Sequence, residues 1–154
     1  MRGGCGGLLM LVLMWAGCGA PQDVCGPAPV AHDWRSGTDL MWASDDEQTC
    51  VRVERTADEL PDDWACKACP FTLHRMVVVH DDVVVDERNA DALTYTPSHH
   101  NWADEAAVSV DDVTYVVRFG PDDISGLADV LEVQRGDDVV DEVPLTPVSM
   151  VDDL

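Results

Sequence analysis

The chain of 154 residues carries 30 Asp and Glu against nine Lys and Arg, a net charge of −21, and 46% of its residues are hydrophobic. This hydrophobic content is ordinary for a globular protein and excludes an intrinsically disordered chain. The negative charge repels phosphates and excludes nucleic-acid binding. The length predicts one domain after a targeting segment, and the Asp-rich composition resembles that of proteins from saline habitats.

The first predicted element is a signal peptide over residues 1–17. Arg2 supplies a positive charge, glycines follow, and residues 8–15 are eight consecutive apolar residues. Eight helical residues rise about 12 Å. The hydrocarbon core of a bilayer is roughly 30 Å thick, so this stretch is too short for a transmembrane helix. The pattern therefore predicts a cleaved leader.

Ala16-Gly17-Cys18 follows this apolar stretch and resembles the lipobox of bacterial lipoproteins. The resemblance covers residues 1–18, and Trp15 departs from it because the class favours Leu at that position. It implies that Cys18 receives a thioether-linked diacylglycerol and becomes the lipidated N-terminus of the mature chain. Two or three acyl chains give a firm membrane anchor.

The destination of the protein depends on where the leader is cut. The residue after Cys18 is Gly19, whereas an aspartate there resembles an inner-membrane retention signal, so the outer membrane of the cell envelope is favoured. The alternative is cleavage after Ala20 by ordinary signal peptidase, which would give a soluble secreted protein. Pro21 makes that bond a poor substrate.

Residues 18–33 are rich in Pro, Gly and Ala and predict a flexible tether ahead of a single β domain over residues 34–154. Four cysteines remain outside the leader and the predicted lipidation site: Cys25, Cys50, Cys66 and Cys69. An even number in an oxidising compartment predicts two disulfides. Of the three connectivities we favour Cys25–Cys50 with Cys66–Cys69, because the first would fasten the tether to the domain.

The Cys66–Cys69 spacing also allows two functional interpretations. A redox pair needs a helix after its first cysteine to lower the thiol pKa, and Pro70 followed by a strand-like stretch leaves no room for one. A zinc site could add His74, or His99 and His100. A structural disulfide is the favoured interpretation because a cysteine pair outside the cytoplasm is usually oxidised.

From Asp39 onward the hydrophobic residues alternate with a period of two, which is typical of half-buried antiparallel strands. In residues 71–79 this alternation predicts a strand with one face formed by the side chains of Phe71, Leu73, Val77 and Val79. Asp-Asp pairs before Val83, Val113 and Val139 separate apolar runs and predict three tight hairpins. One helical turn is predicted after Thr56. Eight or nine strands predict an all-β fold, either an antiparallel β-sandwich or a small barrel.

The candidate binding residues lie in one loop between two predicted strands. This loop, residues 96–105, holds the candidate ligand or metal residues His99, His100, Asn101, Trp102 and Asp104. A hydrolase-type Ser98–His–Asp104 arrangement is a lesser alternative because the loop has no nucleophile elbow, and no catalytic residue is assigned. His32, His74 and His80 stand alone and carry no prediction. Asp-Asp pairs are interpreted as solvated turns with, at most, weakly bound Ca²⁺.

Together these features predict a lipid-anchored, extracytoplasmic envelope protein that acts as a non-enzymatic binding or structural module. Its expected partners are the membrane, through the anchor, and an envelope protein. The alternative is a metal-binding protein that uses His99 and His100, with or without Cys66 and Cys69. No cofactor is expected beyond weakly bound Ca²⁺ or Zn²⁺.

Overall fold

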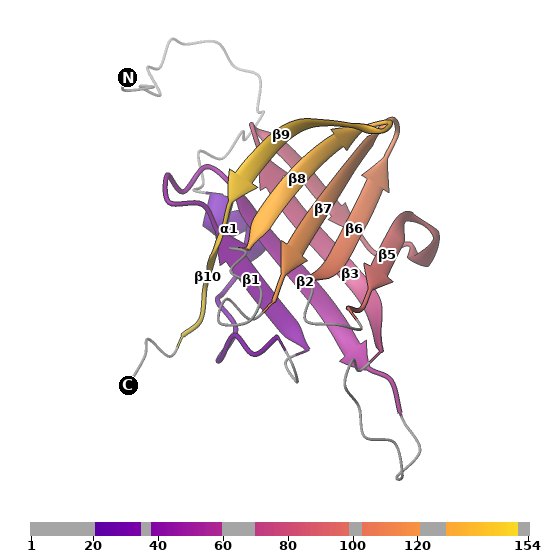
Figure 1. The fold of residues 1–154 in the computed structure, drawn as a ribbon. Helices are drawn as coiled ribbons and strands as arrows, with labels where there is room; N and C mark the ends of the chain where they lie inside the picture. Colours follow the sequence, from indigo (N-terminus) through magenta and orange to yellow (C-terminus); the bar gives the residue numbers. More distant parts are fainter. Residues whose placement is uncertain (1–20, 35–37, 60–69, 99–102, 121–128, 151–154) are drawn as a thin grey trace, which may run out of the picture.

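Two antiparallel sheets of five strands each pack face to face in the computed structural model (Figure 1). The structure describes residues 21–34, 38–59, 70–98, 103–120 and 129–150. The first sheet has the strand order β10-β1-β2-β3-β4 and the second has the order β5-β6-β7-β8-β9. The sheets do not close into a barrel, so the predicted all-β fold is confirmed as a β-sandwich.

The first sheet contains β1 (Asp39–Ala43), β2 (Cys50–Ala57), β3 (Phe71–His80), β4 (Val83–Glu87) and β10 (Thr146–Pro147). The second contains β5 (Leu93–Thr96), β6 (Asp104–Val110), β7 (Val113–Phe119), β8 (Val130–Arg135) and β9 (Asp138–Pro144). The described residues add a short helix, α1 (Pro21–Cys25), and a 3-10 turn, η1 (Ala90–Ala92). In this described part no helix has the length and apolar character needed to span a bilayer.

The three predicted hairpins are confirmed at β3–β4, β6–β7 and β8–β9. In the first, Asp81 and Asp82 both have positive φ angles, 48° and 63°. This geometry matches the turn type that follows the right-handed twist of a two-stranded ribbon. Asp111 (φ 55°) and Gly136 (φ 62°) open the other two turns in the left-handed region.

A β-bulge in β3 changes which side chains face the core. Between Glu54 and Arg55 the register of β2 against β3 shifts by one residue, and His74 is the inserted residue. A one-residue insertion exchanges the two faces of a strand. The predicted common face is therefore wrong: Leu73 lies in the core between the sheets, whereas Val77 and Val79 lie on the outer face.

The main core fills the space between the sheets. Its largest fully buried members come from strands of both sheets: Leu40, Trp42, Val51, Val53, Met76, Val78, Val108, Val117, Phe119 and Leu131. A second, smaller cluster covers the outer face of the first sheet and contains Cys25, Met41, Cys50, Val77 and Val79. The outer face is apolar there because α1 and its disulfide cover it.

Part of the predicted tether is packed on the domain. The Met150 N–H donates to the carbonyl of Pro29 at 2.8 Å, and the His32 ring meets the Trp42 ring edge-on with 4.9 Å between centroids. The helical turn predicted after Thr56 is wrong at its start, because Thr56 belongs to β2. Pairing with β3 satisfies the backbone there and overrides the local capping pattern.

Candidate functional site

The predicted Cys25–Cys50 disulfide is present and joins α1 to the first residue of β2. Both cysteines are buried, with exposed fractions of 3% and 0%. The bridge links residues separated by 25 positions. Closing a loop of this length stabilises the fold by about 3 kcal/mol in the chain-entropy account. Cys66 and Cys69 lie outside the described residues.

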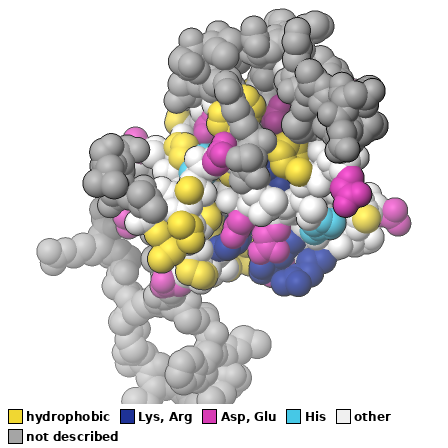
Figure 2. All heavy atoms as spheres, turned by 90° about the horizontal axis from the view of Figure 1, so that it is seen from below, with side chains coloured by type: hydrophobic (Ala, Val, Ile, Leu, Met, Phe, Trp, Pro, Cys, Tyr) yellow, Lys and Arg dark blue, Asp and Glu magenta, His cyan; other side chains and the backbone are white. Residues whose placement is uncertain are grey.

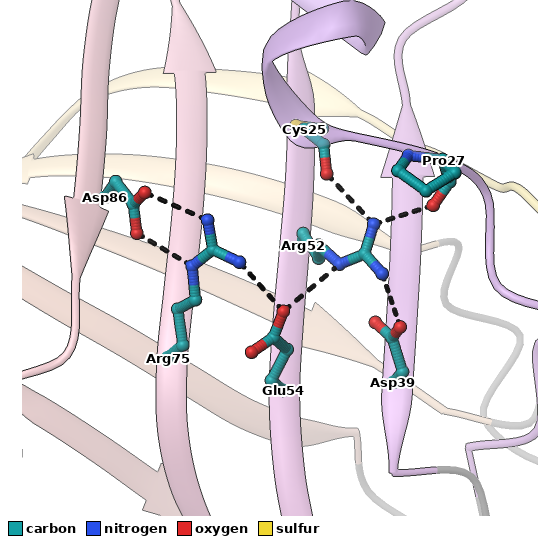
Figure 3. Close-up of polar contacts among 7 residues, drawn as sticks. All are labelled: Cys25, Pro27, Asp39, Arg52, Glu54, Arg75 and Asp86. Atoms are coloured by element: carbon teal, nitrogen blue, oxygen red, sulfur yellow. Dashed lines mark hydrogen bonds and ion pairs between the residues drawn. The ribbon is translucent and has the colours of Figure 1, made fainter.

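Charged side chains form a ladder across the outer face of the first sheet, between α1 and β4 (Figure 3). We call this set the charge ladder, and its members in strand order are Asp86, Arg75, Glu54, Arg52 and Asp39. Arg75 donates to Asp86 at 2.8 and 2.9 Å and to Glu54 at 2.9 Å. These hydrogen bonds from Arg75 hold the pKa of Asp86 below its usual value.

Arg52 extends the charge ladder to the segment that follows α1. Its Nη1 donates to the carbonyl oxygens of Cys25 at 3.0 Å and of Pro27 at 2.7 Å. Its other contacts are with Asp39, through Nη2, and with Glu54 at 3.5 Å. One side chain therefore fixes the disulfide-bearing segment to both β1 and β2 (Figure 3).

Asp104 is the one member of the predicted loop site that lies within the described residues. Its carboxylate accepts hydrogen bonds from the Ser98 backbone N–H at 2.8 Å and from the Tyr95 hydroxyl at 2.7 Å. The residue is 7% exposed. Both carboxylate oxygens therefore hold the base of the loop together. The other predicted site residues, His99, His100, Asn101 and Trp102, lie outside the described part of the chain.

A buried arginine that the sequence analysis did not single out lies beside Asp104. The Arg55 side chain is fully buried, donates to the Tyr95 hydroxyl, and has its Nη1 3.9 Å from Asp104 Oδ2. Its guanidinium carbon lies 3.7 Å from the Phe71 ring centroid. Burial lowers the pKa of Arg55 and raises that of Tyr95. The sequence does indicate that Arg55 faces the core, because it continues the alternation of the inward-facing residues Val51 and Val53.

The two strand ends nearest in sequence to the predicted cysteine pair and the predicted histidine pair are in contact. Phe71 begins β3, just after Cys69, and Tyr95 lies near the end of β5, before His99. The centroids of the Phe71 and Tyr95 rings are 5.6 Å apart. The segments that hold the cysteine pair and the histidine pair therefore connect to neighbouring strand ends.

At the other end of β3, His80 meets two carboxylates. Its Nε2 lies 2.9 Å from Asp141 Oδ2 on β9 and 3.4 Å from Asp81 Oδ2, while its Nδ1 hydrogen bonds with Thr49 Oγ1 at 3.0 Å. One ligand atom from each of the three residues fits within 4.8 Å of the others. We call His80, Asp81 and Asp141 the His80 group.

From the sequence alone His80 has no predicted role, because its second carboxylate, Asp141, is distant in the chain. Only the packing of the two sheets brings β9 beside the end of β3. Asp81, the adjacent residue, was interpreted as part of a turn, and it does lie in one. Imidazole nitrogen with carboxylate oxygen is a ligand set that suits zinc and other transition metals.

Comparisons with models of protein families, with characterised proteins and with solved structures found no match to this chain. The fold defines the class as an antiparallel β-sandwich with a disulfide between its N-terminal helix and its first sheet. Function is therefore inferred from the leader, the disulfide and the side-chain geometry.

Proposed function

We propose that the protein is a lipid-anchored, extracytoplasmic module of a bacterial cell envelope with a binding or structural role and no enzymatic one. The observation that supports this most strongly is the Cys25–Cys50 disulfide. Structural disulfides persist in oxidising compartments and are rare in the cytosol. A domain whose bridge begins shortly after a lipobox-like leader fits export followed by lipidation at Cys18.

The remaining features agree with display on a membrane surface. A large negative charge keeps the folded domain hydrated and soluble at high local density. Edge strand β9 is exposed and carries Asp138, Asp141 and Glu142, which discourage pairing with other strand edges. Gly19 favours the outer membrane, and the module would reach its envelope partner through its loops or its sheet surface.

The test is mass spectrometry of the mature N-terminus of protein from a bacterial host, together with membrane fractionation of a Cys18→Ala variant. We expect a mature chain that begins at acylated Cys18, and a variant that leaves the membrane fraction. Cys5→Ala is the matched control, because it changes a leader cysteine outside the lipobox. An unmodified N-terminus at any other residue would refute lipidation, and a start at Pro21 would establish the secreted alternative.

Metal binding is the second candidate function, and the His80 group is the observation that favours it. His80 is 7% exposed, and its ring is oriented by Thr49 from the side opposite to the carboxylates. A hydrogen bond at the second ring nitrogen is the usual support of a metal-bound histidine. Three protein ligands would leave a fourth position for water.

This alternative has two separate sites to test. The site predicted from sequence uses His99 and His100 with or without Cys66 and Cys69, whereas the His80 group lies at the opposite end of β3. Metal analysis of protein purified from its envelope should show stoichiometric zinc that His80→Ala removes if the His80 group is the site. Loss in a His99→Ala/His100→Ala variant would instead identify the loop. His32→Phe is the control, because His32 belongs to neither candidate site.

A further inference from the structure

Covalent geometry limits the distance between the proposed anchor and the folded domain. Six residues, 19–24, separate Cys18 from Cys25, and Cys25 is fixed to β2 by its disulfide. Three residue steps from 18 to 21 span at most about 11 Å. The helix from Pro21 to Cys25 adds about 6 Å. The outer face of the first sheet therefore lies within roughly 17 Å of the lipidated residue.

Large apolar side chains are exposed around this attachment. Val24 in α1 is 45% exposed, Val30 is 70% exposed and Met150 is 67% exposed. Met150 belongs with the N-terminal segment because its N–H donates to the carbonyl of Pro29. We call Val24, Val30 and Met150 the apolar patch. The other large apolar residues that are exposed in the described structure are valines of the β3–β4 and β8–β9 hairpins.

The charge ladder beside this segment is close to charge balance and α1 adds one exposed carboxylate, Asp23, whereas the protein as a whole is strongly acidic. The charge ladder has two arginines against three carboxylates, whereas the chain has nine basic residues against 30 acidic ones. Figure 2 shows Lys and Arg side chains gathered on one side of the molecule, with Asp and Glu side chains among them and hydrophobic side chains nearby. Such a face is repelled by anionic headgroups less than the net charge of the whole chain would suggest.

We infer that the domain rests on the phospholipid bilayer through the outer face of the first sheet next to α1, with the apolar patch in the headgroup region. This inference rests on the proposed lipid anchor and adds the orientation of the domain. Apolar side chains on a surface held against a membrane are driven into the boundary between headgroups and acyl chains. The second sheet then faces away from the membrane, where a partner can reach it.

The test compares probes on the two sides of the domain in the full-length lipoprotein, reconstituted into vesicles of phosphatidylethanolamine and phosphatidylglycerol. Val30→Cys carries an environment-sensitive dye in the apolar patch, and Val139→Cys carries it in the β8–β9 hairpin. Val139 is a matched control because it is also exposed, at 52%. Labelling without reductant preserves the Cys25–Cys50 bridge, and the unsubstituted protein gives the background.

We expect spin-labelled lipids to quench most of the dye emission at Val30 and to leave the emission at Val139 unchanged. Equal exposure to quencher at the two positions, in protein that floats with the vesicles, would overturn the inferred orientation and leave the anchor intact. Protein that lacks acyl chains and does not float would overturn the proposed function and this inference together. A Val30→Asp variant that abolishes quenching of a dye at position 24 would support the patch as the contact.

Discussion

Arg55 is a charged residue at an inward-facing position of β2, where the alternation of the strand predicts a hydrophobic side chain. Its guanidinium donates to the Tyr95 hydroxyl and to the Trp34 carbonyl, and it lies over the Phe71 ring. A buried ion is stable only when it is paired and hydrogen bonded. Asp104 provides the pairing charge at 3.9 Å. The arginine therefore connects β2 to the base of the predicted loop site.

Replacing Arg55 by Met should destabilise the protein by about 3–5 kcal/mol, because Asp104 would remain buried without its cation. Urea unfolding followed by circular dichroism measures this change. An Arg55→Met/Asp104→Asn double variant should recover part of the loss, since neither charge is then buried alone and the Asn oxygen can still accept a hydrogen bond from the Ser98 N–H. If the single variant is as stable as the parent, the buried pair does not hold this region together.

His32 should make the stability of the protein depend on pH. Burial against the first sheet is the largest cause that lowers its pKa from 6.5. The unfolded chain therefore binds a proton at a higher pH than the folded protein. The free energy of unfolding should be greatest above pH 6.5 and should fall as the pH decreases from there toward the lower folded pKa.

Urea midpoints at several pH values between neutrality and mild acid measure this dependence. A His32→Phe variant keeps an aromatic ring beside Trp42 but has no group that titrates, so its curve should be flatter in this range. Val30→Ala, in the same segment and 70% exposed, is the control because it changes no titrating group. A parent curve that is flat below neutrality would contradict the prediction.

Among the elements, the hairpins show how one dipeptide adopts different turns. Asp81 and Asp82 both have positive φ angles, whereas in the β6–β7 turn Asp111 does and Asp112 does not. Non-glycine residues adopt this conformation at a cost, and Asp tolerates it better than most. The Asp-Asp signal therefore predicts the hairpin but does not specify its turn type.

Asp82→Gly should stabilise the β3–β4 hairpin by about 0.5–1 kcal/mol, because glycine relieves the left-handed strain at the second turn position. Asp112→Gly is the matched control in the β6–β7 hairpin. There the φ angle is not positive, so glycine only adds freedom to the unfolded chain and should be neutral or destabilising. The thermal unfolding midpoints of the two variants measure this difference. Equal shifts in the two midpoints would contradict the prediction that only Asp82→Gly is stabilising.

For the whole molecule, the main electrostatic feature is the net charge of −21. Raising NaCl from about 0.01 M to about 1 M shortens the Debye length from roughly 30 to 3 Å. Screening should weaken the repulsion among surface carboxylates and raise the urea midpoint. A variant with Asp82→Asn and Asp137→Asn, one change in each of two hairpins, should show a smaller salt dependence. A midpoint that falls with salt would mean that attractive pairs dominate instead.

Several features could be predicted from local sequence because local physics decides them. Alternation of apolar residues in β6 and β7 (Val113–Phe119) follows from the pleat of a strand with one buried face. Polar pairs between apolar runs mark hairpins because a tight turn needs residues that tolerate unusual φ angles. The Cys25–Cys50 pairing was favoured from an even cysteine count and the position of the tether.

Other features depend on contacts between distant segments and could not be predicted in this way. The bulge at His74 is invisible to a periodicity of two, because both phases of β3 contain valines that can be buried. The inward phase of Arg55 was readable, but its partner Asp104 lies on another sheet. The His80 group requires β9 to cross the end of β3, which no spacing in the sequence indicates.

The sequence by itself determined the all-β class, the hairpins and the net negative charge, and it predicts export and anchoring at Cys18. Each of these depends on neighbouring residues or on total composition. Only the tertiary structure decided that the sheets stack as a sandwich, that α1 is fastened to the outer face of the first sheet, and that His80 meets Asp141. Those outcomes depend on which surfaces exclude water against each other, and that is a property of the packed chain rather than of any one segment.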